Sequence, residues 1–518
     1  MENNEISLRL NILDSLGSEH MNFQEIRKIA EGTAINFQLG YLIVRIQTRS
    51  ELSISLNSGR IENVSTSNES GMGIQAFTRK GASGFASANI LTQNIANQLS
   101  RKAYELALEN EKSGCELNTN IFLASKARED IPSSGKYSFH EISPTKLQEI
   151  TMEIHQRLLE IKIDQGNVVW QTNYRQIEDF WCIARQDGTL VSFVIPRSVI
   201  LHQGTVKEEK FSQSFSVNRS GVDVEILLNE QQDQNLHYKA QAKTEFIQKV
   251  SSAPQIISGN YPVLIDYGLA KGLAHEAFGH AVESDLIEES ILSENGKLRK
   301  GLIISESEID IIDESIRGDW AYQPYSANGI IRKPVEIVKK GVLQNGLGDI
   351  FSSNKAGIEM TGAGRAEYYG SVPLPRMTNI RLETAETIHL PATLNLHDEI
   401  LKLREVLKAK NLLEEEFHYV LIGYRGGQVN PKTGDFVFQC DGAVNLADPN
   451  LPIFQPGIFS GKILSVLQSV KMSLGEKKID AIGTCGKAGQ HVPSCGGASG
   501  YIFITKNENI RLGGNNNG

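Results

Sequence analysis

Three residues near the middle of the chain have types and a spacing that could hold a catalytic metal. His275, Glu276 and His280 lie in the segment YGLAKGLAHEAFGHAVESD, whose apolar residues indicate a helix around residues 269–288. Imidazoles are common zinc ligands, and a carboxylate beside them can act as a general base. The pattern is close to the metalloprotease motif in which two histidines stand four residues apart on one helix face.

The spacing of the two histidines places a demand on the helix. At about 100° per residue, positions five apart in an α-helix lie about 140° apart, which is too far for two ligands of one metal. The helix must therefore carry a π-type bulge or end in a kink. Gly279, just before His280, would supply the backbone freedom for this. The alternative is that two histidines fell on a buried helix by chance. A catalytic metal site would require a third protein ligand in addition to them.

Three side chains are candidates for that third ligand. A hydrolytic zinc site takes three protein ligands and leaves one position open for water. Glu283 lies on the same helix, and Cys485 and Cys495 lie in the glycine-rich tail. A thiolate would bind zinc well, and with two neutral imidazoles it would leave the site with a net positive charge. The residue types alone do not choose among the three.

The elements that must position these residues change character near residue 250. Before it, helix patterns in FQEIRKIAEGTAINFQ, after Thr92 and from Ser143-Pro144 stand among strand patterns. The segments YLIVRIQT, ELSISLNSGRIENVS and GIQAFTRKGASGFASAN predict a four-stranded antiparallel meander, and Asp187-Gly188 predicts a hairpin. A polar helix should run from about Asn229 to Val250.

We place a domain boundary at residues 250/251, because Ser251-Ser252-Ala253-Pro254 interrupts the periodicity there. The predicted fold class is α+β. Residues 1–250 should form an N-terminal α+β domain with an antiparallel sheet and helices. Residues 251–518 should form a β-rich C-terminal domain that carries the metal-binding helix and a second helix near 397–412. The tail from residue 481 holds 9 of the 46 glycines, which predicts turns and close backbone approaches.

Composition excludes several classes of protein. With 518 residues, 40% of them hydrophobic, the chain should fold into about two to four domains. Its net charge of −9 makes nucleic acid an unlikely direct ligand. We expect no membrane span, and the opening segment MENNEISLRLNILDS is too polar for a signal peptide. Five cysteines, an odd and sparse set, suit a reducing compartment, so the expected location is the cytoplasm.

Over most of its length the chain resembles the TldD-type members of the TldD/PmbA family of zinc metallopeptidases. The segments that carry the resemblance are YLIVRIQTRSELSISLNSGRIENVSTSNESGMGIQAF, GASGFASAN, LAHEAFGHAVESD, PRMTN at Pro375 to Asn379, GGQV at Gly426 to Val429 with TGDFVF after it, and GTCGKAGQHVP. In this family the PmbA-type partner, also called TldE, lacks the His-Glu-x-x-x-His helix. The chain therefore resembles the catalytic type.

The resemblance implies a particular site and assembly. Zinc would be held by His275, His280 and Cys485, with Glu276 as general base and Glu283 in a supporting role. After GQHVP the sequence departs from the family pattern and reads SCGGASG, which adds a second thiol close to the site. The family also implies a dimer around an enclosed cavity, either a homodimer or a heterodimer with a PmbA/TldE-type subunit, and the N-terminal domain would help to form that enclosure.

We therefore expect a zinc-dependent peptidase that hydrolyses peptide bonds in short or unfolded peptides. The family is linked to degradation of unfolded peptides and to maturation of peptide antibiotics. Two alternatives stay open: hydrolysis of a non-peptide amide, or a zinc-stabilised binding subunit of a hetero-oligomer. A further donor should hold the oxyanion, and His491, Arg376, Tyr368 and Tyr369 are polar candidates without a choice among them.

Overall fold

The computed structural model describes residues 22–513 except residues 391, 392, 394 and 414, and it shows the predicted α+β fold. The opening segment MENNEISLRLNILDS and the last five residues of the glycine-rich tail lie outside the described residues. Within the described part of the chain, no helix is both long enough and apolar enough to cross a membrane.

The N-terminal part is built on a seven-stranded sheet in the order β3-β2-β1-β5-β6-β4, with β7 also paired to β6. The strands are β1 (Tyr41–Asn57), β2 (Arg60–Phe77), β3 (Ser83–Ala88), β4 (Arg128–Ile131), β5 (Asn167–Arg185), β6 (Leu190–Glu208) and β7 (Phe211–Gly221). The hairpin at Asp187-Gly188 is confirmed, with φ +95° at Gly188. The predicted meander has three strands instead of four, because residues 48–50 pair with both β2 and β5 and continue one long strand.

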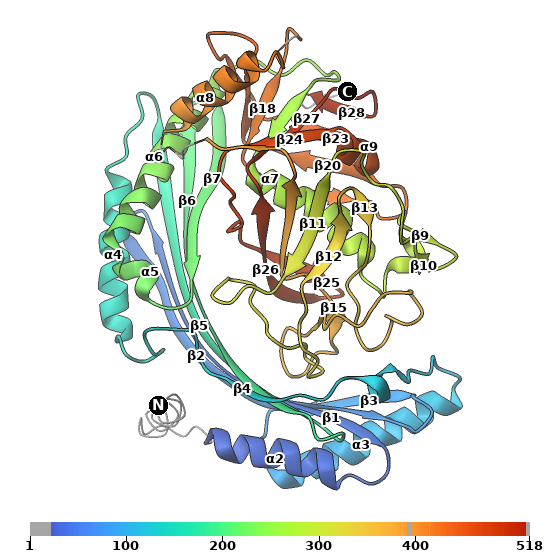
Figure 1. Cartoon of the computed structure of the whole chain (residues 1–518). Helices are drawn as coiled ribbons and strands as arrows, with labels where there is room; N and C mark the ends of the chain where they lie inside the picture. Colours follow the sequence, from blue (N-terminus) through green and yellow to red (C-terminus); the bar gives the residue numbers. More distant parts are fainter. Residues whose placement is uncertain (1–21, 391–392, 394, 414, 514–518) are drawn as a thin grey trace.

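Helices cover the convex face of this curved sheet (Figure 1). They are α2 (Phe23–Asn36), α3 (Gln93–Lys112), α4 (Pro144–Leu159), the short α5 (Glu225–Leu228) and α6 (Glu230–Ser251). A 3-10 turn, η1 (Asn120–Leu123), packs on the other face, where Ile121 joins a buried cluster with Tyr322 of the C-terminal part. The polar residues before α3, α4 and α6 act as N-caps: side-chain oxygens of Thr92, Ser143 and Asn229 accept backbone N–H groups of the first helical turn. The polar helix predicted from Asn229 is therefore confirmed.

The C-terminal part contains three larger sheets and lies on the concave side of the first one (Figure 1). The six-stranded sheet has the order β13-β12-β11-β16-β26-β25, the seven-stranded sheet β17-β24-β27-β8-β18-β21-β22, and the four-stranded sheet β19-β20-β23-β28. Two small hairpins, β9-β10 and β14-β15, complete the set.

The strands of this part are mostly short. They are β8 (Val263–Ile265), β9 (Ser293–Glu294), β10 (Lys297–Leu298), β11 (Ile309–Glu314), β12 (Val335–Lys339), β13 (Val342–Leu343), β14 (Gly364–Arg365), β15 (Leu374–Pro375), β16 (Asn379–Thr384), β17 (Thr387–Ile388), β18 (Tyr419–Ile422), β19 (Gly427–Val429), β20 (Asp435–Gln439), β21 (Gly442–Asn445), β22 (Ile453–Phe454), β23 (Ile458–Lys462), β24 (Val470–Leu474), β25 (Gly483–Lys487), β26 (Gln490–Ala498), β27 (Tyr501–Ile504) and β28 (Ile510–Gly513). The helices are α7 (Tyr267–Gly272), the helical turns η2 (Leu273–Gly279), η3 (His280–Val282) and η4 (Ile287–Glu289), α8 (Leu396–Ala409) and α9 (Ile463–Gln468).

The hydrophobic core runs across the predicted boundary at residues 250/251. One buried cluster joins Leu52 and Phe246 to Leu264 and Leu403, which stand on opposite sides of that boundary in the sequence. Each sheet, however, takes its strands from one side only. The division into domains 1–250 and 251–518 therefore stays a prediction.

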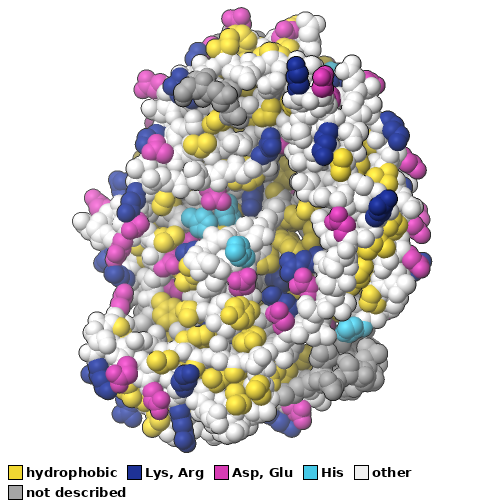
Figure 2. All heavy atoms as spheres, turned by 180° about the vertical axis from the view of Figure 1, so that it is seen from behind, with side chains coloured by type: hydrophobic (Ala, Val, Ile, Leu, Met, Phe, Trp, Pro, Cys, Tyr) yellow, Lys and Arg dark blue, Asp and Glu magenta, His cyan; other side chains and the backbone are white. Residues whose placement is uncertain are grey.

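Charged side chains of both signs are interspersed over the face of the molecule that Figure 2 shows. Lysine and arginine side chains stand next to acidic ones on the parts of that face drawn in colour, and they form no continuous cationic track there. A protein that follows a nucleic-acid backbone presents such a track.

A directed chain of hydrogen bonds links two buried histidines, His155 on α4 and His202 on β6. The N–H of Gly59 donates to Nε2 of His155 (3.0 Å), so the proton of that ring lies on Nδ1 and is donated to Oγ1 of Thr172 (2.8 Å). The Thr172 hydroxyl in turn donates to Nδ1 of His202 (2.8 Å). Both imidazoles are therefore neutral. Burial lowers the pKa of His155 and lowers the pKa of His202 to about 3.

This burial predicts loss of stability in acid. The folded pKa of His202 lies below the value of about 6.5 for an exposed histidine, so the unfolded chain binds the proton more readily between the two values. The contribution of the buried, neutral His202 to the free energy of unfolding is complete above about pH 6.5 and is lost as the pH falls toward 3. In urea unfolding at several pH values, His202→Asn should flatten the slope by up to about 1.4 kcal/mol per pH unit. Equal slopes for His202→Asn and the unchanged protein would contradict this account.

Candidate metal centre

The two histidines lie on a helix whose winding changes at their position. Asp266 caps α7, where its carboxylate accepts the N–H of Leu269 (2.8 Å), and η2 continues α7 as a π-helix. The N–H of His280 donates to the carbonyl of His275, which is the five-residue bond of a π-helix between the two candidate ligands themselves. The ring centroids are 5.1 Å apart. The predicted π-type bulge is confirmed, and the helix ends at Val282, earlier than predicted.

The reason predicted for Gly279 is wrong. Its φ of −53° and ψ of −57° are ordinary right-handed helical values that any residue adopts. What requires glycine is space, because a Cβ at this position would lie 1.7 Å from Sδ of the buried Met377. Met377 belongs to the PRMTN segment, so this segment packs directly against the π-helix.

An edge hairpin brings the third ligand candidate to the helix. β25 pairs antiparallel with β26, with Cys485 opposite Val492, and β26 pairs with β16 at the centre of the sheet. Ligand atoms of His275, His280 and Cys485 all lie within 4.8 Å of one another, and Cys485 Sγ is 3.6 Å from His280 Nε2. We call this group the His-His-Cys cluster. Sequence reasoning alone could not choose Cys485, since only the hairpin places it there.

The donor set fits a zinc ion. Two imidazole nitrogens and one thiolate match the ligands of a catalytic zinc site with one position left open. Nδ1 of His275 is buried and has no hydrogen-bond partner within the described residues, which is a costly state for a polar atom unless the ring has another role. Burial, reinforced by the charges of Lys271 and His280, holds the pKa of His275 well below its ordinary value, so the ring is neutral and offers a lone pair.

The two tail cysteines differ in the charge they can carry. Burial raises the pKa of the Cys485 thiol, but the hydrogen bond and the charge of His280 outweigh it and hold that pKa below its ordinary value. At Cys495, burial and the nearby Asp319 both raise the pKa, and the thiol donates to the carbonyl of Ile479 (3.4 Å). Of these two cysteines, only Cys485 stands where a thiolate is stabilised.

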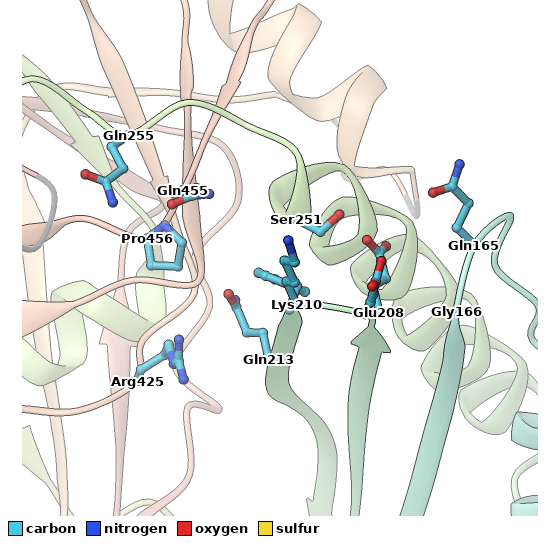
Figure 3. A pocket seen from close by; sticks show the side chains of 12 residues that line it. Gln165, Gly166, Glu208, Lys210, Gln213, Ser251, Gln255, Arg425, Gln455 and Pro456 are labelled. Carbon is cyan, nitrogen blue, oxygen red and sulfur yellow. The ribbon is translucent and has the colours of Figure 1, made fainter.

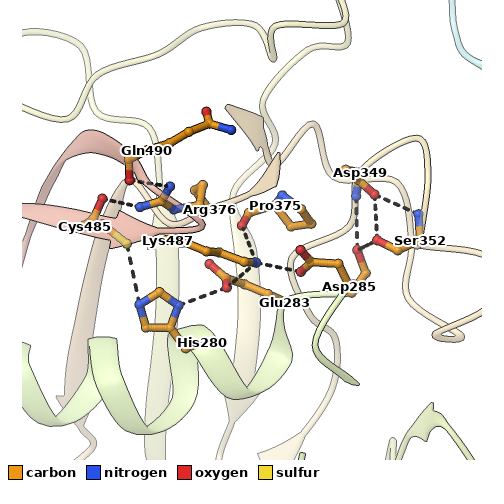
Figure 4. A network of polar contacts seen from close by, with 11 residues as sticks. His280, Glu283, Asp285, Asp349, Ser352, Pro375, Arg376, Cys485, Lys487 and Gln490 are labelled. Carbon is orange, nitrogen blue, oxygen red and sulfur yellow. Dashed lines mark hydrogen bonds and ion pairs between the residues drawn. The ribbon is translucent and has the colours of Figure 1, made fainter. Parts of the chain in front are cut away.

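Glu283 orients His280 and does not join the cluster. Its Oε2 accepts from His280 Nδ1 (2.9 Å), which leaves Nε2 of that ring facing Cys485. Nζ of Lys487 donates to the same oxygen (2.8 Å) and to Asp285 (2.7 Å), as Figure 4 shows. Burial alone would raise the pKa of Glu283, yet His280 and Lys487 together hold it below its ordinary value. A charged carboxylate behind a ligating imidazole fixes its orientation and increases its basicity.

The oxyanion candidates named from the sequence have other surroundings in the structure. Arg376 is fully buried and donates to the backbone carbonyls of Cys485 and Gln490, so it holds the hairpin in place (Figure 4). His491 lies opposite Gly486 in the hairpin, one position out of step with Cys485, and therefore points to the other face. Tyr369 packs over Gly71 of the N-terminal sheet, and the neighbouring Tyr368 is 41% exposed.

Glu276 stands at the open part of the helix. It is partly exposed, whereas residues 271–275 and 277–279 are buried. Burial raises the pKa of Glu276, and the charges of His280 and Lys271 oppose this rise. A carboxylate beside the cluster with access to solvent can accept a proton from water.

Sequence reasoning missed two lysines at this site. Lys487 belongs to the GTCGK segment and stands two residues after Cys485, so strand alternation could have placed it on the same face. Lys271 gives no comparable signal. Its ammonium lies 3.2 Å from Ser494 Oγ, and a Cβ at Gly483 would lie 3.0 Å from it. Two tail glycines, Gly483 and Gly496, thus make room for a buried lysine.

Comparisons with known proteins point to one family. The family model described as PmbA/TldA metallopeptidase C-terminal domain matches residues 258–494, and the one described as PmbA/TldA metallopeptidase domain 1 matches residues 43–109. A metalloprotease of Methanocaldococcus jannaschii is 25% identical over 91% of this chain and 96% of its own length. A zinc metalloprotease TldD homolog of Saccharolobus solfataricus is 26% identical over 50% of this chain and 52% of its own.

The crystal structure of TldE from Thermococcus kodakarensis has the same fold. It superposes with a TM-score of 0.68 over 95% of this chain and 100% of its own, at 14% sequence identity. Two matched domains of one family, covering more than half of the chain, define the class of protein. The chain belongs to the TldD/PmbA family.

The contact between Gly279 and Met377 can be tested by a double-mutant cycle. Gly279→Ala should lower the free energy of unfolding by about 1–3 kcal/mol through overpacking. Met377→Ala should lower it by about 2–5 kcal/mol through the cavity it leaves. The double variant should be less destabilised than the sum, because the new methyl group then enters the space that the methionine vacates. Urea unfolding measures all three; additivity within about 0.5 kcal/mol would contradict the contact.

Proposed function

We propose that the chain is a zinc-dependent peptidase, the TldD-type subunit of its family, that hydrolyses peptide bonds in short or unfolded peptides. The observation that carries the proposal is the partly exposed carboxylate of Glu276 next to the His-His-Cys cluster. A purely structural zinc site has no need of a base beside its ligands. The names of the metalloprotease relatives support a metal, and one of those names specifies zinc.

His275, His280 and Cys485 would hold the ion. When bound, zinc supplies Lewis acidity, which polarises the carbonyl of the scissile bond and makes water easier to deprotonate. The Glu283 carboxylate keeps His280 turned toward Cys485, and Lys487 keeps that carboxylate ionised. Arg376 fixes the backbone of the strand that carries the thiol.

Glu276 would move the proton. Its carboxylate takes a proton from the attacking water and returns it to the departing amine as the carbon–nitrogen bond breaks. A carboxylate in this role must be ionised before the reaction and close to the substrate. Its partial exposure, beside the buried residues 271–275 and 277–279, is consistent with contact to a substrate. The neighbouring charges of His280 and Lys271 favour the ionised form.

The sheet order supports an extended peptide as substrate. Among the described residues, β25 is the last strand of its sheet, so the outer edge of the strand that carries Cys485 has no strand partner there. An extended peptide can pair with such an edge through main-chain hydrogen bonds, with little regard to its side chains. We place the reaction in the cytoplasm. We further propose that the N-terminal sheet helps enclose the substrate in a dimer, with a second copy or with a TldE-type subunit as the partner.

Substitutions in the cluster should separate metal binding from catalysis. His275→Ala and His280→Ala should lose both zinc and activity. Glu276→Gln should keep about one zinc per chain and lower kcat by about 10²–10⁴-fold, since the base is not a ligand. Elemental analysis together with the rate of cleavage of an unstructured peptide measures both properties. An active Glu276→Gln variant would show that another group moves the proton.

Cys485 and Cys495 provide a matched pair of substitutions that tests which cysteine is the third ligand. Cys485→Ser should severely weaken zinc binding, because a hydroxyl is a far poorer zinc ligand than a thiolate. Cys495→Ser should retain zinc and activity. Competition with a chelator compares the two affinities, and the reverse ranking would mean that Cys495 is the ligand.

The state of the substrate should decide whether it is cut. An edge strand can pair only with a peptide whose own main chain is free, so a stably folded protein should resist cleavage and a destabilised variant of it should not. Mass spectrometry of both digests gives the rates. Equal rates would mean an open site that does not select extended chains. A panel of non-peptide amides in the same assay tests the alternative substrate class.

A further inference from the structure

Tyr424 is a residue that no sequence pattern singled out, and it contacts the helix of the two histidines. The loop that carries Tyr424 joins β18 to β19, and the tyrosine ring lies across Gly272, the last residue of α7. A Cβ at Gly272 would lie 2.7 Å from Cζ and 3.1 Å from the hydroxyl oxygen of this ring. Phe438 packs against the ring at an angle of 70°, with the ring centroids 5.9 Å apart. The glycine thus permits a close approach that brings the hydroxyl end of the ring to the helix backbone.

The hydroxyl lies on the side of the helix that carries Glu276. Gly272 and Glu276 are four residues apart, so they are neighbours on successive turns. Burial raises the pKa of the Tyr424 hydroxyl, and the Glu276 carboxylate raises it further, as expected for two groups that face each other. Tyr424 and Glu276 are both partly exposed, whereas helix residues 272–275 are buried. Each of the two side chains therefore has a part that a ligand can reach.

The Tyr424 hydroxyl has no hydrogen-bond partner in the part of the chain that the structure describes. Other tyrosines of the molecule do use theirs: Tyr261 donates to the carbonyl of Ile257 (2.8 Å), and Tyr325 to Glu129 (2.6 Å). A donor that is fixed by its ring and free at its tip is preorganised for a ligand atom. Among the described residues, no hydrogen bond joins this hydroxyl to Glu276.

A polar cavity adjoins the same loop. It has a volume of about 800 Å³ and lies between the ends of β5, β6 and β7 and the C-terminal part. Gln213, Gln455 and Arg425 are among its lining residues, as Figure 3 shows. Arg425 follows Tyr424 directly. The loop therefore presents Arg425 to this cavity and Tyr424 to the helix that carries the two histidines.

We propose that Tyr424 is a further catalytic residue, whose hydroxyl donates a hydrogen bond to the oxygen of the scissile carbonyl as that oxygen becomes negative. This inference rests on the proposed peptidase function. Attack of water on a peptide carbonyl moves an electron pair onto that oxygen, and a fixed hydrogen-bond donor stabilises the charge. The tyrosine keeps its proton throughout, while Glu276 moves the proton of the water. The two side chains thus act on different atoms of the substrate.

The test compares Tyr424→Phe with a matched control, Tyr261→Phe, which removes a hydroxyl that donates to a backbone carbonyl near the surface. For an unstructured peptide, Tyr424→Phe should lower kcat by about 10²–10³-fold and leave KM and zinc content unchanged. Affinity for a phosphinic peptide, which mimics the tetrahedral transition state, should fall by a similar factor. Affinity for the cleaved product should stay the same. Tyr261→Phe should change none of these values.

Three results would overturn the inference, and they can be told apart. If Tyr424→Phe cleaves the peptide and binds the phosphinic analogue like the unchanged protein, the hydroxyl has no catalytic role. If zinc content falls together with activity, the ring only supports the metal helix. If the unchanged, zinc-loaded protein neither cleaves peptides nor binds the analogue, the proposed function itself fails. Placing 3-fluorotyrosine at position 424 keeps both ring and hydroxyl, so it should retain activity even if the phenylalanine variant folds poorly.

Discussion

The site depends on one backbone hydrogen bond, from the N–H of His280 to the carbonyl of His275. Two imidazoles five residues apart diverge on an α-helix, and only a wider turn brings them to one side. A π-helical turn is less favourable than an α-helical one and persists where packing holds it. Here Met377 fills the space left by Gly279, and Tyr424 fills the space left by Gly272. Residues far apart in the sequence thus maintain the winding that the ligands need.

The charged groups around the His-His-Cys cluster also help to hold its residues in place. The cluster holds one group that is stabilised as a thiolate and one imidazole that is kept neutral by burial. Around them, Glu283 and Lys487 form a buried pair that fixes His280, and Arg376 fixes the strand of Cys485 through its backbone. Losing one partner of such a pair would leave a buried charge uncompensated. The ligand set and its support therefore form one electrostatic unit.

The sequence predicted local features well, because these depend on neighbouring residues. The N-caps at Thr92 and Ser143, the Asp187-Gly188 turn and the bulge between His275 and His280 all follow from short-range patterns. Its errors came from packing between distant segments. The role of Gly279 is set by Met377, and β1 runs on through a polar stretch because strands pair with it on both sides. Tyr424 could not be found because only the fold places its loop against α7. The choice of Cys485 came from resemblance to a family, and the structure brings that residue to the two histidines.

The central claim is that one zinc ion is held by two imidazoles and one thiolate. X-ray absorption at the zinc edge of the purified protein tests it most directly. The account predicts one sulfur at about 2.3 Å and two imidazole nitrogens at about 2.0–2.1 Å, with a further light atom in the open position. The sulfur signal should disappear in Cys485→Ser and remain in Cys495→Ser. A spectrum with no sulfur, with two sulfurs, or with a sulfur that survives Cys485→Ser would contradict the account.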